Sequence, residues 1–155
     1  MILKNTILTL LSLGALISCS DETVGKSEAS LEPEKKKVIR VSVDPKTYSQ
    51  GRKLFLVNCA TCHGSQGEGE KDWRTVGADG VNKAPPLNGS GHAWHHSTSA
   101  LTNVIKNGTA KIGGKMPAWK DKLSDREINL ILAWMTAQWS DEIYTAWHNR
   151  FSQNN

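Results

Sequence analysis

The sequence predicts an all-α domain of about four to five helices connected by long loops. Apolar residues recur at helical spacing in several separate segments, and the first and last of these begin with residues that cap helices. A glycine-rich stretch from Gly64 to Gly91 lacks this spacing and reads as loop. No segment alternates apolar and polar residues as a half-buried strand does. The chain has 155 residues, 38% of them apolar, which is enough for one compact domain.

The first predicted helix begins near Asp44. Asp44 is of the type that caps a helix N-terminus, and Pro45 suits the first helical position because its missing N–H would have no partner there anyway. Apolar or small residues then recur at helical spacing: Tyr48, Gly51, Phe55 and Cys59. Two further apolar residues, Leu54 and Val57, widen this face. We therefore expect an amphipathic helix in this segment.

A second helix is predicted in STSALTNVIKNG, residues 97–108. Its apolar residues, Leu101, Val104 and Ile105, share one face, and Asn107-Gly108 is a typical helix stop. We expect this face to point inward.

The clearest helical pattern lies in residues 123–139. Ser124 and Glu127 have the spacing of a capping box, in which each side chain bonds the other residue's backbone N–H. The apolar positions that follow have helical period: Ile128, Ile131, Leu132, Met135 and Trp139. We expect the folded domain to span residues 44–139. The extension 140–155 is expected to form a further short helix that lies back over an apolar edge, or else docks a partner protein.

The N-terminus has the features of an exported protein. Lys4 precedes an apolar run, Ile7 to Ile17, that is too short to span a bilayer and fits the core of a signal peptide. The run ends in LISC, residues 16–19, which resembles the lipobox of bacterial lipoproteins, where cleavage precedes a cysteine that becomes lipidated. The sequence thus predicts a lipoprotein signal peptide over residues 1–18 and a lipid on Cys19. The alternative is an ordinary secretory peptide with Cys19 near its cleavage point by chance.

Residues 19–43 are polar and mixed in charge, with no sustained periodicity, and predict a flexible tether behind the lipidated cysteine. Such a tether would hold the domain on the periplasmic side of a bacterial membrane. Ser20 favours the outer membrane under the enteric sorting rule and Asp21 weakens that reading, so the sequence leaves inner and outer membrane open.

Charge excludes one class of partner. The formal net charge is +4, and the basic residues are scattered apart from the run at 35–37. No basic helix or stripe of basic and aromatic residues appears, so a nucleic-acid partner is not expected.

The motif CATCH, residues 59–63, carries the chemistry of the chain. Four interpretations compete: a structural disulfide between Cys59 and Cys62, a redox dithiol, a zinc site, or C-x-x-C-H as an attachment site for c-type haem. The disulfide would close a very small loop, and the dithiol is expected beside a βαβ pattern, which is missing. The zinc site would need a distant histidine, beyond the usual finger spacing. The haem site explains all three residues, since two thiols one helical turn apart can bond the porphyrin vinyl groups while His63 binds the iron.

A sixth iron ligand is expected later in the chain. Once the signal peptide is lost, the methionines that remain are Met116 and Met135. Met135 lies on the inward stripe of its helix and is expected to pack. Met116 lies in the glycine-rich segment 108–119 and precedes Pro117, so we expect it to be the axial ligand, with a histidine as the alternative. A thioether ligand stabilises reduced iron and raises the potential.

The sequence resembles the class I cytochrome c family over about Tyr48 to Trp139. The resemblance is carried by four segments in the family's order: GRKLFLVNCATCHG, APPLNG, GGKMPAW and LSDREINLILAWM. It implies a cytochrome c fold around one covalently bound haem.

The resemblance also implies individual roles. Gly51 and Phe55 would meet Ile131 and Trp134 where two helices cross, with Trp134 standing where many relatives have Tyr. The carbonyl of Pro85 would accept a hydrogen bond from the non-ligating nitrogen of His63, and Leu87 would pack on the haem. For Pro85 and Pro86, simple stiffening of the loop is the other interpretation.

Two features lie outside the family's core pattern: the histidines of HAWHH and the tail after Trp139. His92, His95 and His96 are read either as solvated loop residues, as a copper or zinc site, or as the source of an iron ligand in place of Met116. Trp73, Trp94 and Trp119 would line the haem pocket or simply pack.

The function expected from these residues is that of a monohaem c-type cytochrome, an electron-transfer protein rather than an enzyme. It would pass single electrons between redox proteins. The alternatives are a haem sensor or peroxidase-like enzyme with an open or labile sixth iron position, and a copper-handling protein that uses His92, His95 and His96.

Overall fold

The computed structural model describes residue 40 and residues 42–151, which belong to one compact unit. The predicted signal peptide, Cys19, most of the predicted tether and residues 152–155 lie outside the described residues. The helices are α1 Pro45–Asn58, α2 Ala60–His63, η1 Ala93–His95, α3 Thr98–Asn107, η2 Ala110–Ile112, α4 Asp125–Ala137 and α5 Asp141–Phe151, where η marks a 3₁₀-helix. In this part of the chain the only strand-like features are isolated bridges, Val76 with Asn82 and Asn82 with Gly114. The all-α prediction is confirmed.

The helix ends follow the capping residues expected from the sequence. The carboxylate of Asp44 accepts hydrogen bonds from the N–H groups of Lys46 and Thr47, at 3.1 and 3.0 Å, and Pro45 is the first residue of α1. At α4, Ser124 Oγ accepts from Glu127 N while Glu127 Oε2 accepts from Ser124 N, so both halves of the capping box form. These bonds satisfy N–H groups that a helix cannot pair internally.

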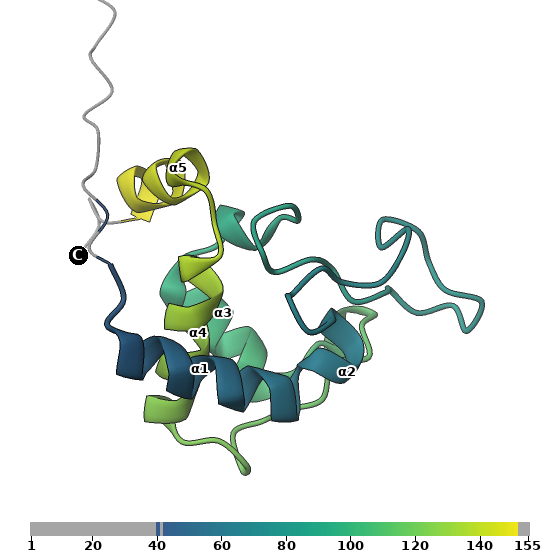
Figure 1. Ribbon diagram of the computed structural model, residues 1–155. Helices are drawn as coiled ribbons and strands as arrows, with labels where there is room; N and C mark the ends of the chain where they lie inside the picture. The colour runs from purple at the N-terminus through teal and green to yellow at the C-terminus, as the bar shows by residue number, and fades with distance from the viewer. Residues whose placement is uncertain (1–39, 41, 152–155) are drawn as a thin grey trace, which may run out of the picture. The chain divides into compact units, whose positions relative to one another are not determined.

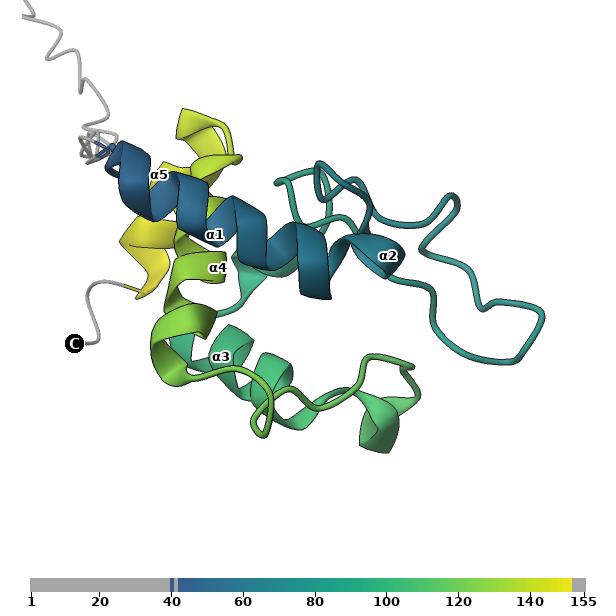
Figure 2. The same cartoon turned by 60° about the horizontal axis from the view of Figure 1, so that its bottom comes forward.

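The core forms where α1 crosses α4 (Figures 1 and 2). Phe55 is fully buried, and its ring centroid lies 4.3 Å from that of Trp134. Gly51 lies one helical turn before Phe55 and faces the backbone of Leu130 on α4. The expected crossing is therefore present, and Ile131 belongs to the same buried cluster. The buried cluster consists of Phe55, Ala93, Leu123, Ile128, Ile131, Leu132, Trp134, Met135 and Trp139.

Val57 corrects the apolar face predicted for α1. Its exposed fraction is 73%, whereas Leu54 packs partly buried against the core. Val57 lies two residues beyond Phe55, which is about 200° around a helix, so it faces away from the surface that Phe55 buries. The expectation was wrong because it counted apolar residues without their angular positions.

Helix α3 begins after Ser97, whose hydroxyl accepts from Ala100 N at 3.2 Å, and ends at Gly108, as expected. Leu101 and Ile105 pack on the core cluster but stay half-buried, and no α3 residue is fully buried.

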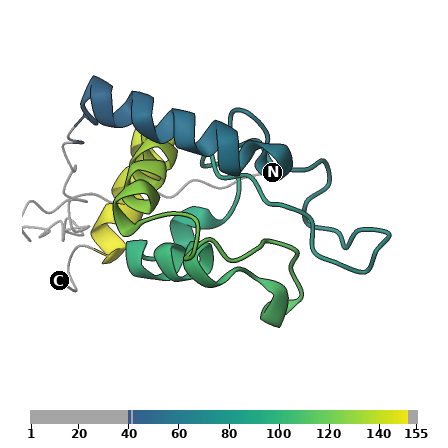
Figure 3. The ribbon, with the colours of Figure 1, turned by 90° about the horizontal axis from the view of Figure 1, so that it is seen from below.

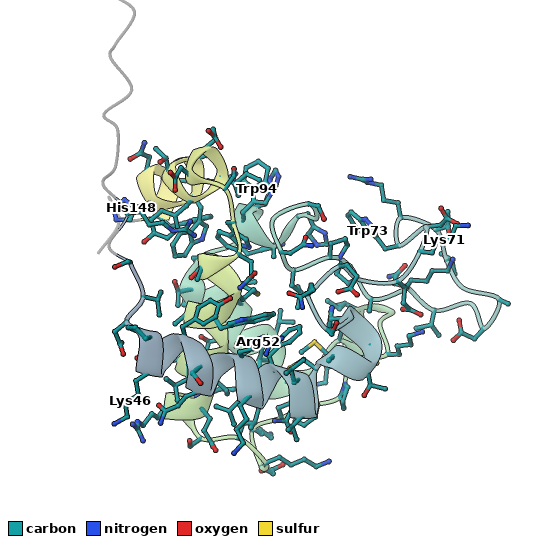
Figure 4. The ribbon with its side chains drawn as sticks, viewed as in Figure 1. Lys46, Arg52, Lys71, Trp73, Trp94 and His148 are labelled. Carbon is teal, nitrogen blue, oxygen red and sulfur yellow. The ribbon has the colours of Figure 1, made fainter. Side chains whose placement is uncertain are left out.

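Helix α5 lies against η1, as predicted for an extension that folds back over the domain (Figure 1). Trp147 meets Trp139 edge to face with centroids 5.4 Å apart, and its Nε1 donates to the carbonyl of His96 at 2.8 Å. Figure 4 shows Trp94, from η1, beside this helix. The helix thus covers an apolar edge of the core.

Arg40 belongs to the segment expected to be a tether, yet it contacts the end of α4. Its guanidinium donates to the carbonyls of Thr136 and Trp139, the latter at 2.8 Å, and lies 3.5 Å from a carboxylate oxygen of Asp141. It also stacks over the ring of Tyr144, at 4.6 Å from the centroid. Arg40 therefore ties the start of the described chain to the α4–α5 junction.

Candidate functional site

The CATCH motif forms the junction between α1 and α2. Cys59 ends α1, with its N–H donating to Phe55 O at 2.8 Å, and it begins the single turn of α2. Cys62 N and His63 N both donate to Cys59 O, at 3.2 and 3.0 Å. The two thiols therefore stand one turn apart with His63 directly after them. Gly64 ends the turn with a φ of 76°, a conformation that favours glycine.

The two thiols are free, with Cys59 half-buried and Cys62 exposed. Burial, together with the nearby Cys62, raises the pKa of Cys59 to about 11. A redox dithiol needs the opposite, because the thiolate is the reactive form and a lowered pKa supplies it. The environment of Cys59 thus disfavours the dithiol interpretation.

His63 is a buried polar residue with an exposed fraction of 8%. Its Nδ1 lies 2.9 Å from the carbonyl oxygen of Pro85, the contact that the cytochrome c resemblance implies. A ring that donates through Nδ1 has Nε2 as its basic nitrogen, which is then the atom available to a metal. Burial lowers the pKa of His63, with the Pro85 bond and the charge of Glu70 acting in the opposite direction. The lowered pKa favours the neutral imidazole that binds metals.

Backbone bonds hold the loop after His63 against the Pro85 segment. Gly69 N donates to His63 O at 2.7 Å, and Leu87 N donates to Gly67 O at 2.7 Å. Leu87 O in turn accepts from Trp139 Nε1 at 2.9 Å, and the Leu87 side chain is half-buried against the core. A Cβ on Gly69 would lie 2.5 Å from Pro86 N, so only glycine permits this close approach.

Met116 lies half-buried in the segment between η2 and α4, and Thr109 holds it at both backbone groups. Thr109 N donates to Met116 O at 3.0 Å, and Met116 N donates to Thr109 Oγ1 at 3.1 Å. A Cβ on Gly108 would lie 2.5 Å from Met116 O, so glycine is needed beside this loop. The Met116 segment also meets the loop after His63, since Asn82 N donates to Gly113 O at 3.2 Å. Figure 3 shows the loop after α2 and the segment after α3 on the same side of the domain.

His92, His95 and His96 do not converge on one point in the described structure. His92 stacks on Trp73 at 5.4 Å and meets His96 at 5.6 Å, but His95 packs on Trp94. Among the described residues, no group of three or more His, Cys, Asp and Glu side chains is placed to hold a metal ion. The geometry gives no support to a three-histidine copper or zinc site. In Figure 4, Trp73 lies on the long loop near Lys71.

Sequence reasoning missed the polar residues that hold these loops together. Glu70 bonds two other segments, through Ala84 and Lys115, and Thr109 closes its own segment by bonding Met116 seven residues later. No local sequence pattern marks either residue. Their only shared feature is a preceding glycine in a segment that carries a predicted iron ligand: Glu70 follows Gly69 in the loop after His63, and Thr109 follows Gly108 in the segment of Met116.

The residues present fit a c-type haem. They offer two unpaired thiols one turn apart, an imidazole oriented through Nδ1, and a thioether on a loop tied to the imidazole's own loop. Nitrogen and sulfur donors of this kind are the usual ligands of haem iron.

Comparison with known proteins gives the same result. Residues 46–135 match the family described as "Cytochrome C oxidase, cbb3-type, subunit III". The cbb3-type cytochrome c oxidase subunit CcoP of Azospirillum sp. (strain B510) is 31% identical over 94 residues, which are 61% of this chain and 29% of that protein. Cytochrome c6 of Bryopsis maxima is 33% identical over 85 residues, 55% of this chain and 84% of that protein. The subunit FixP of Azorhizobium caulinodans is 30% identical over 92 residues, 59% of this chain and 27% of that protein. No solved structure matches the chain significantly.

The fold and the site define a cytochrome c domain. The chain belongs to the family described as cbb3-type cytochrome c oxidase subunit III, whose cytochrome c domains are electron carriers and not catalysts. A domain of this type implies covalently bound haem c. The chain spans less than a third of the CcoP and FixP proteins but most of the length of cytochrome c6.

Proposed function

We propose that this chain is a monohaem c-type cytochrome that passes single electrons between redox proteins at the periplasmic face of a bacterial membrane. The observation that carries the proposal is the CATCH turn, in which free thiols at Cys59 and Cys62 precede a buried His63 held through Nδ1 by Pro85. When bound, the haem supplies a one-electron ferric–ferrous couple.

Each residue of the site has one task in this proposal. Cys59 and Cys62 would hold the haem through thioether bonds, and His63 and Met116 would supply the nitrogen and sulfur ligands of its iron. Pro85 fixes the His63 ring and strengthens its donor nitrogen, while Leu87 packs against the haem. With His63 and Met116 both serving as iron ligands, the chain would leave no iron position for a substrate. Small, transient interfaces suit exchange of electrons with partners.

A cbb3-type oxidase is the partner that the relatives suggest, since CcoP and FixP are named as subunits of such oxidases. We propose that this chain delivers electrons to an oxidase of that type.

A lipid on Cys19 would keep the carrier at the membrane. Among the described residues, no helix has the length and apolar character required to cross a bilayer. Cell fractionation tests the anchor directly: the wild-type chain should sediment with membranes and release after Cys19→Ser. A soluble wild-type chain would exclude it.

Anaerobic titration of the haem-loaded domain tests the carrier function. We expect one electron per chain, full reversibility, and a reduced form that does not bind carbon monoxide. Oxidation of the reduced domain by a purified cbb3-type oxidase would support the partner. Rapid carbon monoxide binding would favour the haem sensor or peroxidase-like alternative, because it requires an open or labile sixth position.

A further inference from the structure

One carboxylate, that of Glu70, connects three segments of the site. Glu70 N donates to Ala84 O at 2.9 Å, and Ala84 N donates back to Oε2 of Glu70. The other carboxylate oxygen, Oε1, lies 3.2 Å from Nζ of Lys115. Glu70 itself follows Gly69, whose N–H donates to His63 O.

The two partners of Glu70 stand directly beside the residues that fix the iron. Ala84 precedes Pro85, whose carbonyl oxygen lies 2.9 Å from His63 Nδ1. Lys115 precedes Met116. The Glu70 carboxylate therefore spans from the histidine side of the site to the methionine side. A second link, from Asn82 N to Gly113 O, runs beside it.

The charges of this pair favour its formation. Hydrogen bonding from Ala84 N and then from Lys115 lowers the pKa of Glu70, and the bond to Glu70 raises the pKa of Lys115. Both groups are ionised at neutral pH. The side chains remain 34% and 41% exposed, so water and salt screen part of the attraction.

We infer that Glu70 is a positioning residue whose ion pair with Lys115 forms a latch, holding the Met116 segment against the loop of His63 so that Met116 stays on the iron. This inference rests on the proposed function, in which His63 and Met116 are the axial ligands. The latch joins residues far apart in sequence, so it closes two loops onto each other rather than stiffening one turn.

The chain offers a matched control pair. Lys106 Nζ lies 2.7 Å from a carboxylate oxygen of Asp125, and these side chains are 33% and 74% exposed. This ion pair joins α3 to the start of α4, and neither member adjoins a predicted ligand. Glu68 is a second control, because its carboxylate accepts from Gln66 N within its own turn.

The test measures how readily imidazole displaces Met116 from the ferric iron of the haem-loaded protein. Binding is followed by loss of the weak red methionine-to-iron absorption band. The variants are Glu70→Gln, Lys115→Gln and the double variant, with Lys106→Gln and Glu68→Gln as controls. The imidazole affinity should rise about two- to fivefold in each latch variant, the size that a partly exposed ion pair supports. The controls should match the wild type.

The double variant separates a latch from two independent effects. If the side chains act through each other, the double variant should resemble the stronger single variant instead of showing the product of both changes. Lys115→Gln leaves the Glu70–Ala84 bonds in place, so it tests the latch even where Glu70→Gln fails to mature.

An unchanged affinity in Lys115→Gln would overturn the latch, as would independent, multiplicative effects in the double variant. Both results leave the proposed function intact, because they require a wild type with covalent haem and a methionine band. A wild-type chain that acquires no covalent haem would overturn the proposed function, and the latch with it.

Discussion

A Cβ atom placed on Gly51 would lie 2.8 Å from Cβ of Trp134 and 2.1 Å from the carbonyl oxygen of Leu130. The close crossing of α1 and α4 therefore depends on a hydrogen atom at position 51. This close crossing brings the ring centroids of Phe55 and Trp134 to 4.3 Å from each other. Phe55 lies one helical turn before Cys59. The packing of the two helices and the position of the CATCH turn are thus set by the same contact.

Gly51→Ala should lower the free energy of unfolding of the haem-loaded domain by about 1–3 kcal/mol, because overpacking here outweighs the gain of about 1 kcal/mol in helix propensity. Denaturant unfolding measures the change. Lys53→Ala, on an exposed position of the same helix, should stay within about 0.5 kcal/mol of the wild type. If Gly51→Ala is as stable as the wild type, α1 and α4 can move apart at position 51 without loss of folding free energy.

Met116→Ala should abolish the methionine-to-iron band, lower the reduction potential and allow carbon monoxide to bind the reduced iron, because the thioether would no longer fill the sixth position. Absorption spectroscopy and redox titration give these readouts. Met135→Leu is the matched control, since Met135 is buried in α4 with 3% exposure and should leave the band unchanged. Retention of the band in Met116→Ala would assign the ligand elsewhere.

The capping box of α4 should make stability depend on pH. Hydrogen bonds from Ser124 lower the pKa of Glu127 below its ordinary value of 4.5. The ionised carboxylate is therefore favoured in the folded state, so its stabilising effect is complete above pH 4.5 and is lost as pH falls through the lower folded pKa. The stability difference between wild type and Glu127→Ala, from denaturant midpoints, should be larger at pH 7 than at pH 3. An equal stability difference between wild type and Glu127→Ala at pH 7 and pH 3 would show that ionisation of Glu127 is not linked to folding.

Arg40→Ala should lower the free energy of unfolding by about 1–2 kcal/mol. It removes charged hydrogen bonds to the carbonyls of Thr136, in the last turn of α4, and of Trp139, just after that helix, together with a stacking contact with Tyr144. Arg40→Lys should recover only part of the loss, since an ammonium group lacks the planar fork that reaches two carbonyls. Arg52→Ala, at an exposed position of α1, is the control. Denaturant unfolding measures the change. If Arg40→Ala is as stable as the wild type, the contacts of Arg40 with the α4–α5 junction do not contribute to stability.

Features encoded locally could be predicted from the sequence. Asp44 and Ser124 were identifiable as caps because their bonds reach only two or three residues along the chain. The period of the apolar residues predicted that Met135 packs in the core. The family resemblance, and not the period, predicted the contact between Phe55 and Trp134.

Contacts between distant loops could not be predicted in this way. Glu70 with Lys115 and Arg40 with the α4–α5 junction are contacts of polar side chains that show no periodicity and meet their partners only after the chain folds. The contact of His96 with Trp147 is of the same kind. The roles of Cys59, Cys62, His63 and Met116 toward haem remain predictions that the geometry supports.

The central claim is most directly tested by the absorption spectrum and intact mass of the soluble domain, matured in a host that attaches c-type haem. We expect the mass of one haem bound through Cys59 and Cys62, a c-type spectrum when reduced, and the red methionine band when oxidised. A chain of unmodified mass with no haem absorption would contradict it.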